Sequence, residues 1–148
     1  MYILGIHNGH DAAACLFKDH QLIAFCKEER LTRRKNDGGR FELHSIDEVL
    51  RIGKINREAI DVVAMSRKKL PLKAFKQVDL SKRLRDVFRN FNDRPKGLSL
   101  EKEMIRHRQI DEDKLLNLPA LRVELRVRED VEIRFINHDY AHVLSTFY

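Results

Sequence analysis

The amino-acid sequence predicts an α/β domain whose mixed sheet opens in the order β-β-β-α-β. Three short apolar runs, separated by turn-forming residues, lie within the first 27 positions, and the first of them is rich in β-branched residues. An amphipathic stripe follows a highly charged segment, as in a helix that packs one face against a sheet. A further apolar run is typical of a strand buried on both faces of a sheet with parallel strands.

The first three strands are placed where polar residues interrupt apolar ones. Residues 2–6 end before the Asn-Gly pair at 8–9 and are too few for a helix. Residues 12–17 and 21–27 flank Lys-Asp-His at 18–20, which is the spacing and chemistry of a β-hairpin. We therefore expect three consecutive strands before the first helix.

A helix is predicted over 43–52, because Leu43, Ile46 and Leu50 share one helical face. Ser45 and Glu48 offer an alternative, later start signal in the form of a capping box. The run at 59–65 is then the fourth strand.

Residues 66–130 are predicted to be a largely helical, basic insertion. Between positions 66 and 108 there are fourteen Lys and Arg against five Asp and Glu. Apolar residues at helical spacing predict an amphipathic basic helix over 72–91, which ends before the turn residues 92–97. A second helix is expected from Ser99. The segment 111–129 is assigned as helix, although its alternation at 121–127 also fits a strand.

The last elements and the bulk properties complete the prediction. A strand is expected over 131–136 and the start of a helix at His138. The net charge of +6 and pI near 9.5 favour anionic partners such as phosphates, nucleotides or nucleic acid. Cys15 and Cys26 lie in apolar runs and are expected to be buried thiols. With neither a basic leader nor a membrane-length apolar stretch, a cytoplasmic, soluble protein is expected.

Three motifs carry candidate chemistry. In GIHNGHDAAA, His10 and Asp11 follow a glycine turn at the end of the first strand, where an imidazole and a carboxylate could act as base and acid. An Asp that only caps the turn is the alternative.

In KEERLTRRKND, residues 27–37, clustered cations suit a phosphoryl or carbamoyl phosphate oxygen. A solvated charged loop would have the same composition.

The third motif is HDYAHVLSTFY, in which His138 and His142 stand four residues apart. On a helix this spacing places both imidazoles on one face, where they could share a first-row metal ion. Two surface histidines of an amphipathic helix are the alternative.

Taken in this order and at these distances, the three motifs resemble the amino-terminal part of the carbamoyltransferase family that includes nodulation-type and antibiotic O-carbamoyltransferases. More distantly, they resemble the enzymes that make threonylcarbamoyladenosine on tRNA. The resemblance implies the first lobe of an actin/Hsp70/sugar-kinase-like (ribonuclease H-like) fold. It covers residues 1–65 and 131–148 well, and the basic middle only in general layout.

The family's site residues can be carried over to matching positions. The resemblance implies that His10 is a base near the transferred carbamoyl group, with Asp11 as its acidic neighbour. Lys35 would hold the anionic donor or polarise its carbonyl. The matches of Glu29, Arg30 and Arg33 imply substrate binding.

The resemblance also implies that His138 and His142 bind iron(II) beside nucleotide phosphates. Two positions depart from the family pattern. Asp139 stands where a second histidine is common, and Asn36 replaces a frequent histidine.

The resemblance therefore predicts a partial O-carbamoyltransferase. It would help to transfer carbamoyl from carbamoyladenylate, made from ATP and carbamoyl phosphate, to a small hydroxylated acceptor. The remaining metal carboxylates, the phosphate loops and the second domain of the family lie beyond residue 148. We expect 1–148 to be an N-terminal lobe, inactive without a C-terminal portion or complementary subunit.

Two other functions are compatible with the sequence. One is a non-catalytic module that binds nucleic acid through the basic helix, although the low aromatic content of 7% argues against base stacking. The other is a relative of the tRNA-directed threonylcarbamoyl transferases, which would reconcile the basic surface with the fold.

Overall fold

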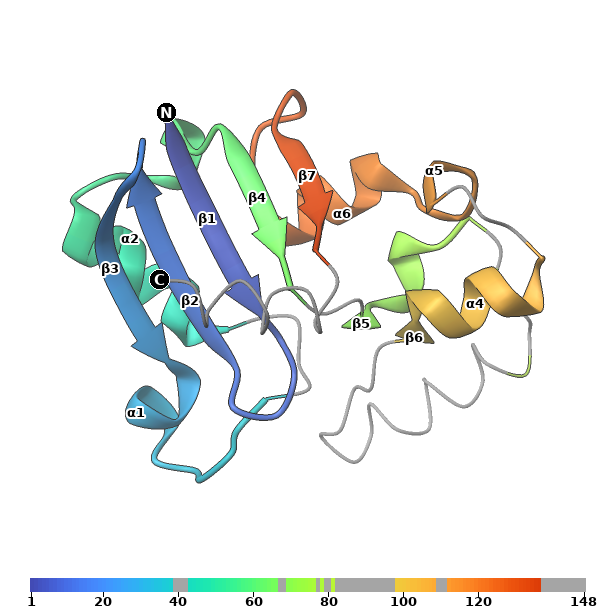
Figure 1. Ribbon diagram of the computed structural model, residues 1–148, viewed down its shortest axis with the longest axis horizontal. Coiled ribbons are helices and arrows are strands. Elements are labelled where there is room, and N and C mark those ends of the chain that lie inside the picture. The colour runs from blue at the N-terminus through green and yellow to red at the C-terminus, as the bar shows by residue number, and fades with distance from the viewer. Residues whose placement is uncertain are drawn as a thin grey trace.

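A computed structural model describes residues 1–38, 43–66, 69–76, 78, 81, 98–108 and 112–136. Within these residues five strands form one mixed sheet in the order β3-β2-β1-β4-β7 (Figure 1). Their bounds are β1 Tyr2–His7, β2 Ala13–Lys18, β3 Gln21–Lys27, β4 Val62–Met65 and β7 Glu132–Phe135.

The strand directions decide which loops meet. β2 runs antiparallel to both β1 and β3, whereas β4 is parallel to β1 and β7 is parallel to β4. The carboxyl ends of β1, β4 and β7 therefore lie at one edge of the sheet. Because β2 is antiparallel to β1, β2 begins at this same edge. In open sheets with parallel strands, ligands bind outside such an edge.

Helices connect and cover these strands. The α-helices are α1 Glu28–Thr32, α2 His44–Gly53, α4 Leu100–Arg106, α5 Glu112–Leu115 and α6 Leu118–Leu125. Two 3₁₀ helices are η1 Arg57–Ala59 and η2 Leu72–Ala74, and a separate two-stranded sheet joins β5 Lys69–Leu70 to β6 Leu98–Ser99.

One face of the sheet packs against the two helices α2 and α6, which Figure 1 shows behind it, and the core extends to Leu70 of β5, Ala74 of η2 and Leu100 of α4. Leu4 of β1 and Leu16 of β2 are paired neighbours in the ladder, and both are fully buried. From α2 the predicted stripe is confirmed: Leu43, Ile46 and Leu50 are each at most 5% exposed. Apolar periodicity alone thus identified the buried face of this helix.

A single arginine ties the two covering helices together. Arg57 of η1 donates from one guanidinium nitrogen to the Asp47 carboxylate of α2, at 2.5 Å. Another of its nitrogens donates to the carbonyl of Leu125, the last residue of α6, at 2.6 Å. The planar guanidinium group can serve two acceptors in this way.

The predicted opening of three strands followed by a helix is confirmed, but a short helix that was not predicted, α1, precedes α2, and some element ends are shifted. Strand β3 has the predicted bounds, β1 ends one residue later than predicted, and β2 and α2 are each shifted by one residue toward the carboxyl end. The fourth strand begins only at Val62, because residues 57–59 form η1. Ser99 is the N-cap of α4 and accepts from the Lys102 N–H at 3.5 Å. The helical assignment of 111–129 is confirmed as two helices, α5 and α6.

The basic helix expected over 72–91 is wrong at its start. Residues 72–74 form η2, and Phe75 makes a β-bridge to Leu116. Backbone hydrogen bonds from Lys76 N–H to Leu115 O and from Asn117 N–H to Ala74 O hold this pairing. Most of 77–97 lies outside the described residues.

Neither cysteine forms a disulfide. Burial raises the pKa of Cys15 above its ordinary value, and a weaker opposing effect comes from the Gly5 backbone. The pKa of Cys26 is raised by burial and by the nearby Glu48 and Glu28 carboxylates. Near neutral pH both groups therefore remain thiols, which are poor nucleophiles. In the described part of the chain, no helix is both long and apolar enough to cross a bilayer.

The packing gives a stability prediction. Leu16→Ala should lower the free energy of unfolding by about 2–5 kcal/mol, because it opens a cavity in the fully buried face. The matched control is Leu22→Ala, since Leu22 on the neighbouring strand is 53% exposed and should lose under about 1 kcal/mol. Urea unfolding followed by circular dichroism measures both. Equal losses would contradict this description of the core.

Candidate functional site

The His10 turn, residues 8–12, connects β1 to β2. Asn8 is almost fully buried at 2% exposed, whereas His10 is exposed to solvent. Asp11 adopts the left-handed conformation, with φ of 57°, which Asp tolerates better than most residues. The turn is therefore anchored by a buried residue, Asn8, and exposes the imidazole of His10 to solvent.

The Lys35 loop, residues 33–38, follows α1. Arg33 caps this helix in the left-handed conformation, and its N–H donates to the Glu29 carbonyl. Asn36 is also left-handed, and its N–H donates to the Glu29 carboxylate at 3.2 Å. Arg33 and Lys35 are both exposed. Glu29 thus shapes the loop that carries the cations.

The His10 turn and the Lys35 loop are in direct contact. The Ala12 N–H donates to the Asp37 carbonyl at 3.0 Å. At Gly38 the approach is so close that a Cβ would lie 1.8 Å from the Gly9 carbonyl oxygen, so only glycine fits there. The fold therefore brings together two of the three segments that the sequence singled out.

His7, which the sequence analysis did not select, contacts the same turn. Its Nε2 lies 3.2 Å from the His10 carbonyl oxygen, and its Nδ1 lies 2.9 Å from Ser66 Oγ. His7 is the last residue of β1, and Ser66 directly follows β4. No local pattern could signal this contact, because 59 positions separate the two residues.

Glu28 is the second residue that sequence reasoning missed. It is fully buried, and its two carboxylate oxygens accept from the N–H groups of His44 and Ser45, at 3.1 and 2.8 Å. These are the first two residues of α2, whose N-cap Leu43 provides no side-chain hydrogen bond. Glu28 therefore caps α2 from a distance. The sequence did carry one indication of this cap: Leu43 is a poor N-cap residue, so another group has to accept from the first N–H groups of α2.

The other predicted site residues have different surroundings. Arg30 is exposed on α1. The Glu29 carboxylate lies 3.9 Å from Lys27 Nζ, and the Glu29 side chain is 21% exposed. Three cationic side chains, Arg30, Arg33 and Lys35, therefore project into solvent along α1 and the Lys35 loop.

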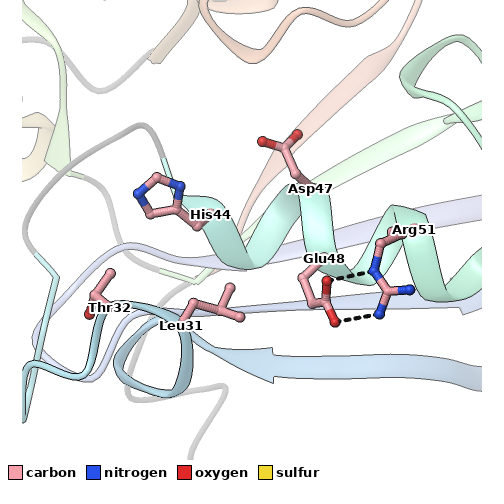
Figure 2. Close-up of a pocket in the computed structure, with 6 residues that line it drawn as sticks. All are labelled: Leu31, Thr32, His44, Asp47, Glu48 and Arg51. Carbon is pink, nitrogen blue, oxygen red and sulfur yellow. Dashed lines mark hydrogen bonds and ion pairs between the residues drawn. The ribbon is translucent and has the colours of Figure 1, made fainter.

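A pocket of about 400 Å³ lies elsewhere, between α1 and α2 (Figure 2). Figure 2 shows a bidentate contact between Glu48 and Arg51 along its wall. Hydrogen bonding to Arg51 lowers the pKa of the Glu48 carboxyl, so this group stays ionised. None of the predicted site residues lines this pocket, so it does not belong to the His10 site. Its lining residues are Leu31, Thr32, His44, Asp47, Glu48 and Arg51.

The third motif cannot be placed. His138 and His142 lie outside the described residues, the last of which is Ile136. In the part of the chain that is described, no group of three His, Cys, Asp or Glu side chains is arranged to hold a metal ion.

Comparison with known families settles what kind of domain this is. The family model described as the carbamoyltransferase N-terminus matches residues 2–148. The chain belongs to the carbamoyltransferase N-terminal family. A search of curated proteins finds no match. The mixed five-strand sheet opening β-β-β-α fits the first lobe of the carbamoyltransferase N-terminal domain.

The buried carboxylate of this carbamoyltransferase N-terminal domain gives a second prediction. Glu28→Ala should reduce the free energy of unfolding by about 2–4 kcal/mol, because two backbone donors at the start of α2 lose their charged acceptor. Thermal unfolding followed by calorimetry measures the loss.

The matched control for Glu28→Ala is Glu48→Ala. Glu48 pairs with Arg51 of the same helix, and the Arg51 side chain is 71% exposed, so this variant should lose much less stability than Glu28→Ala. If Glu28→Ala is as stable as Glu48→Ala, Glu28 does not cap α2.

Proposed function

We propose that this domain contributes the acceptor-activating wall of an O-carbamoyltransferase site. The observation that carries the proposal is the contact between the His10 turn and the Lys35 loop, made through Ala12 N–H and Asp37 O. This contact joins the segment that carries the solvent-facing imidazole of His10 to the loop that carries the cations. An imidazole can accept the proton of an attacking hydroxyl, and nearby cations can stabilise the negative charge that develops during acyl transfer.

In the proposed reaction, the carbamoyl group passes from the adenylate to the acceptor hydroxyl. The hydroxyl oxygen of the acceptor attacks the carbamoyl carbon, and His10 takes the hydroxyl proton. The bond from the carbamoyl carbon to the adenylate oxygen breaks, and AMP leaves with that electron pair. The products are the carbamoylated acceptor, AMP and one proton.

The exposed cations would serve the anionic donor. Lys35 offers a mobile point charge, and Arg33 and Arg30 offer planar forks for phosphate or carbonyl oxygens. Their exposure is compatible with a ligand that a further portion of the enzyme covers. We accordingly propose that 1–148 is one lobe, completed by a C-terminal portion or a complementary subunit.

The finer fold assignment is also a proposal. The sheet order β3-β2-β1-β4-β7, with only β2 antiparallel to the others, supports the first lobe of an actin/Hsp70/sugar-kinase-like fold. ATP and carbamoyl phosphate as substrates, a small hydroxylated acceptor and a cytoplasmic location are proposed on the same family basis.

Iron(II) is proposed with His138 and His142 as two of its ligands. β7 ends at the edge of the sheet where β1 leads into the His10 turn, and one residue of sequence separates Ile136 from His138. Imidazole is a suitable ligand for iron, whose role when bound would be to neutralise nucleotide phosphates.

Binding of the donor tests the role of Lys35. Lys35→Gln should weaken binding of a stable carbamoyladenylate analogue to the chain by about tenfold, because one charge-assisted hydrogen bond is lost. Lys102→Gln on α4 removes the same charge away from the site and should leave affinity unchanged. Isothermal titration calorimetry measures both, and equal affinities for the two variants would contradict the role of Lys35.

Transfer itself tests the role of His10. The protein should be isolated from its own cells with any further segment or partner that it carries, and supplied with ATP, carbamoyl phosphate and small hydroxylated compounds. His10→Gln should lower the rate of carbamoylation at least about 100-fold, because the amide cannot accept the proton. Mass spectrometry of the acceptor measures the product. A His10→Gln enzyme as fast as wild type would eliminate His10 as the base.

Iron binding by the chain has its own test. We expect weak binding, because two imidazoles leave most coordination positions to water. His138→Ala should abolish it, whereas His20→Ala, in the turn between β2 and β3, should not. Equilibrium dialysis of Fe(II) under anaerobic conditions distinguishes the two, and an unchanged affinity of His138→Ala would contradict the assignment.

A further inference from the structure

We propose that His7 and Ser66 are positioning residues that fix the backbone of His10 and so orient its imidazole toward the acceptor. The inference rests on the proposed function in one respect only, namely that His10 is the base. The contacts themselves are independent of that role, so the two can be tested separately.

The hydrogen bonds specify one tautomer of His7. The His10 carbonyl oxygen can only accept, so the hydrogen bond at 3.2 Å requires a proton on His7 Nε2. In the neutral ring Nδ1 is then an acceptor, and the Ser66 hydroxyl donates to it at 2.9 Å. Ser66 thereby determines which nitrogen of His7 carries the proton, and His7 in turn holds the His10 carbonyl.

The sheet makes this relay rigid. His7 and Ser66 stand at the carboxyl ends of two adjacent parallel strands, β1 and β4. The Ser66 N–H donates to the Ile6 carbonyl at 3.0 Å, so the ladder between the two strands continues to the position of the side-chain contact. Groups supported by strands hold a site more precisely than groups on free loops.

The other side of His10 is held as well. At Ala12 the N–H donates to Asp37 O, and the carbonyl accepts from Glu28 N–H at 2.8 Å. The backbone around His10 and Asp11 is therefore held by hydrogen bonds on both sides. One is made at the His10 carbonyl, and two are made at the N–H and carbonyl of Ala12. The His7 contact restrains the turn from the β4 side.

This arrangement matters because a general base works only within reach of the proton that it removes. A displacement of about 1 Å can cost about 100-fold in rate. Removing the His7 contact should loosen the turn without removing the imidazole of His10. The expected result is a lower kcat with an unchanged KM for the acceptor.

The first experiment reads the tautomer in the chain itself. Long-range proton–nitrogen correlation spectra of the chain labelled with ¹⁵N-histidine should show His7 with its proton on Nε2. His7→Gln assigns the signals. Ser66→Ala should give a mixture of tautomers, because Nδ1 loses its donor, and Ser66→Thr should restore the single tautomer. A proton on Nδ1 in the wild-type chain would overturn the proposal, as would an unchanged His7 spectrum in Ser66→Ala.

The second experiment measures kinetics in the protein isolated with its further segment or partner. Ser66→Ala should lower kcat about tenfold at constant KM, and Ser66→Thr should recover most of it. His44→Ala, which removes an exposed imidazole on α2, is the control and should match wild type. Wild-type kcat in Ser66→Ala would overturn the positioning role.

The two proposals fail in different ways. An Nε2–H tautomer that depends on Ser66, in a protein without carbamoyl transfer, would contradict the proposed function and leave the contact in place. Carbamoyl transfer that needs His10 but is indifferent to both Ser66 variants would do the reverse.

Discussion

The structure around the site depends on one buried carboxylate. Glu28 begins α1, donates its own N–H to the Ala12 carbonyl, and accepts from the first two N–H groups of α2. A charge that is fully buried is costly unless it is surrounded by donors, and the start of a helix supplies both donors and a favourable dipole. The start of β2, α1 and α2 are therefore held in one arrangement, and the Lys35 loop leaves α1 from a fixed point.

Three acidic or basic neighbours in one charged run do different things. Glu28 is buried and supports the fold, Glu29 accepts from Asn36 N–H and shapes the loop, and Arg30 faces solvent. Their side-chain chemistry in the sequence gives little hint of this division. It follows from the geometry of a short helix, in which successive residues point about 100° apart, so that only Glu28 faces the start of α2.

The sheet contributes the second constraint. Because β1 and β4 are parallel neighbours, residues far apart in the chain arrive side by side at one edge, and His7 meets Ser66 there. The hairpin from β1 to β2 returns along that same edge and carries His10. The proposed reaction needs a base with a fixed orientation and cations with mobile ends, and the fold provides a restrained turn next to an exposed loop.

The sequence by itself determined the local elements. Apolar runs between turn residues and helical periodicity arise within single strands and helices, so they located β1 to β3, the buried stripe of α2 and the start of α4 at Ser99. The order of motifs indicated the family. Tertiary structure decided the rest. The bridge at Phe75, the pairing of β5 with β6, the capping of α2 by Glu28 and the contact of His7 with Ser66 each join residues distant in the chain. No local periodicity records such a contact, because its energy exists only once both segments have been brought together.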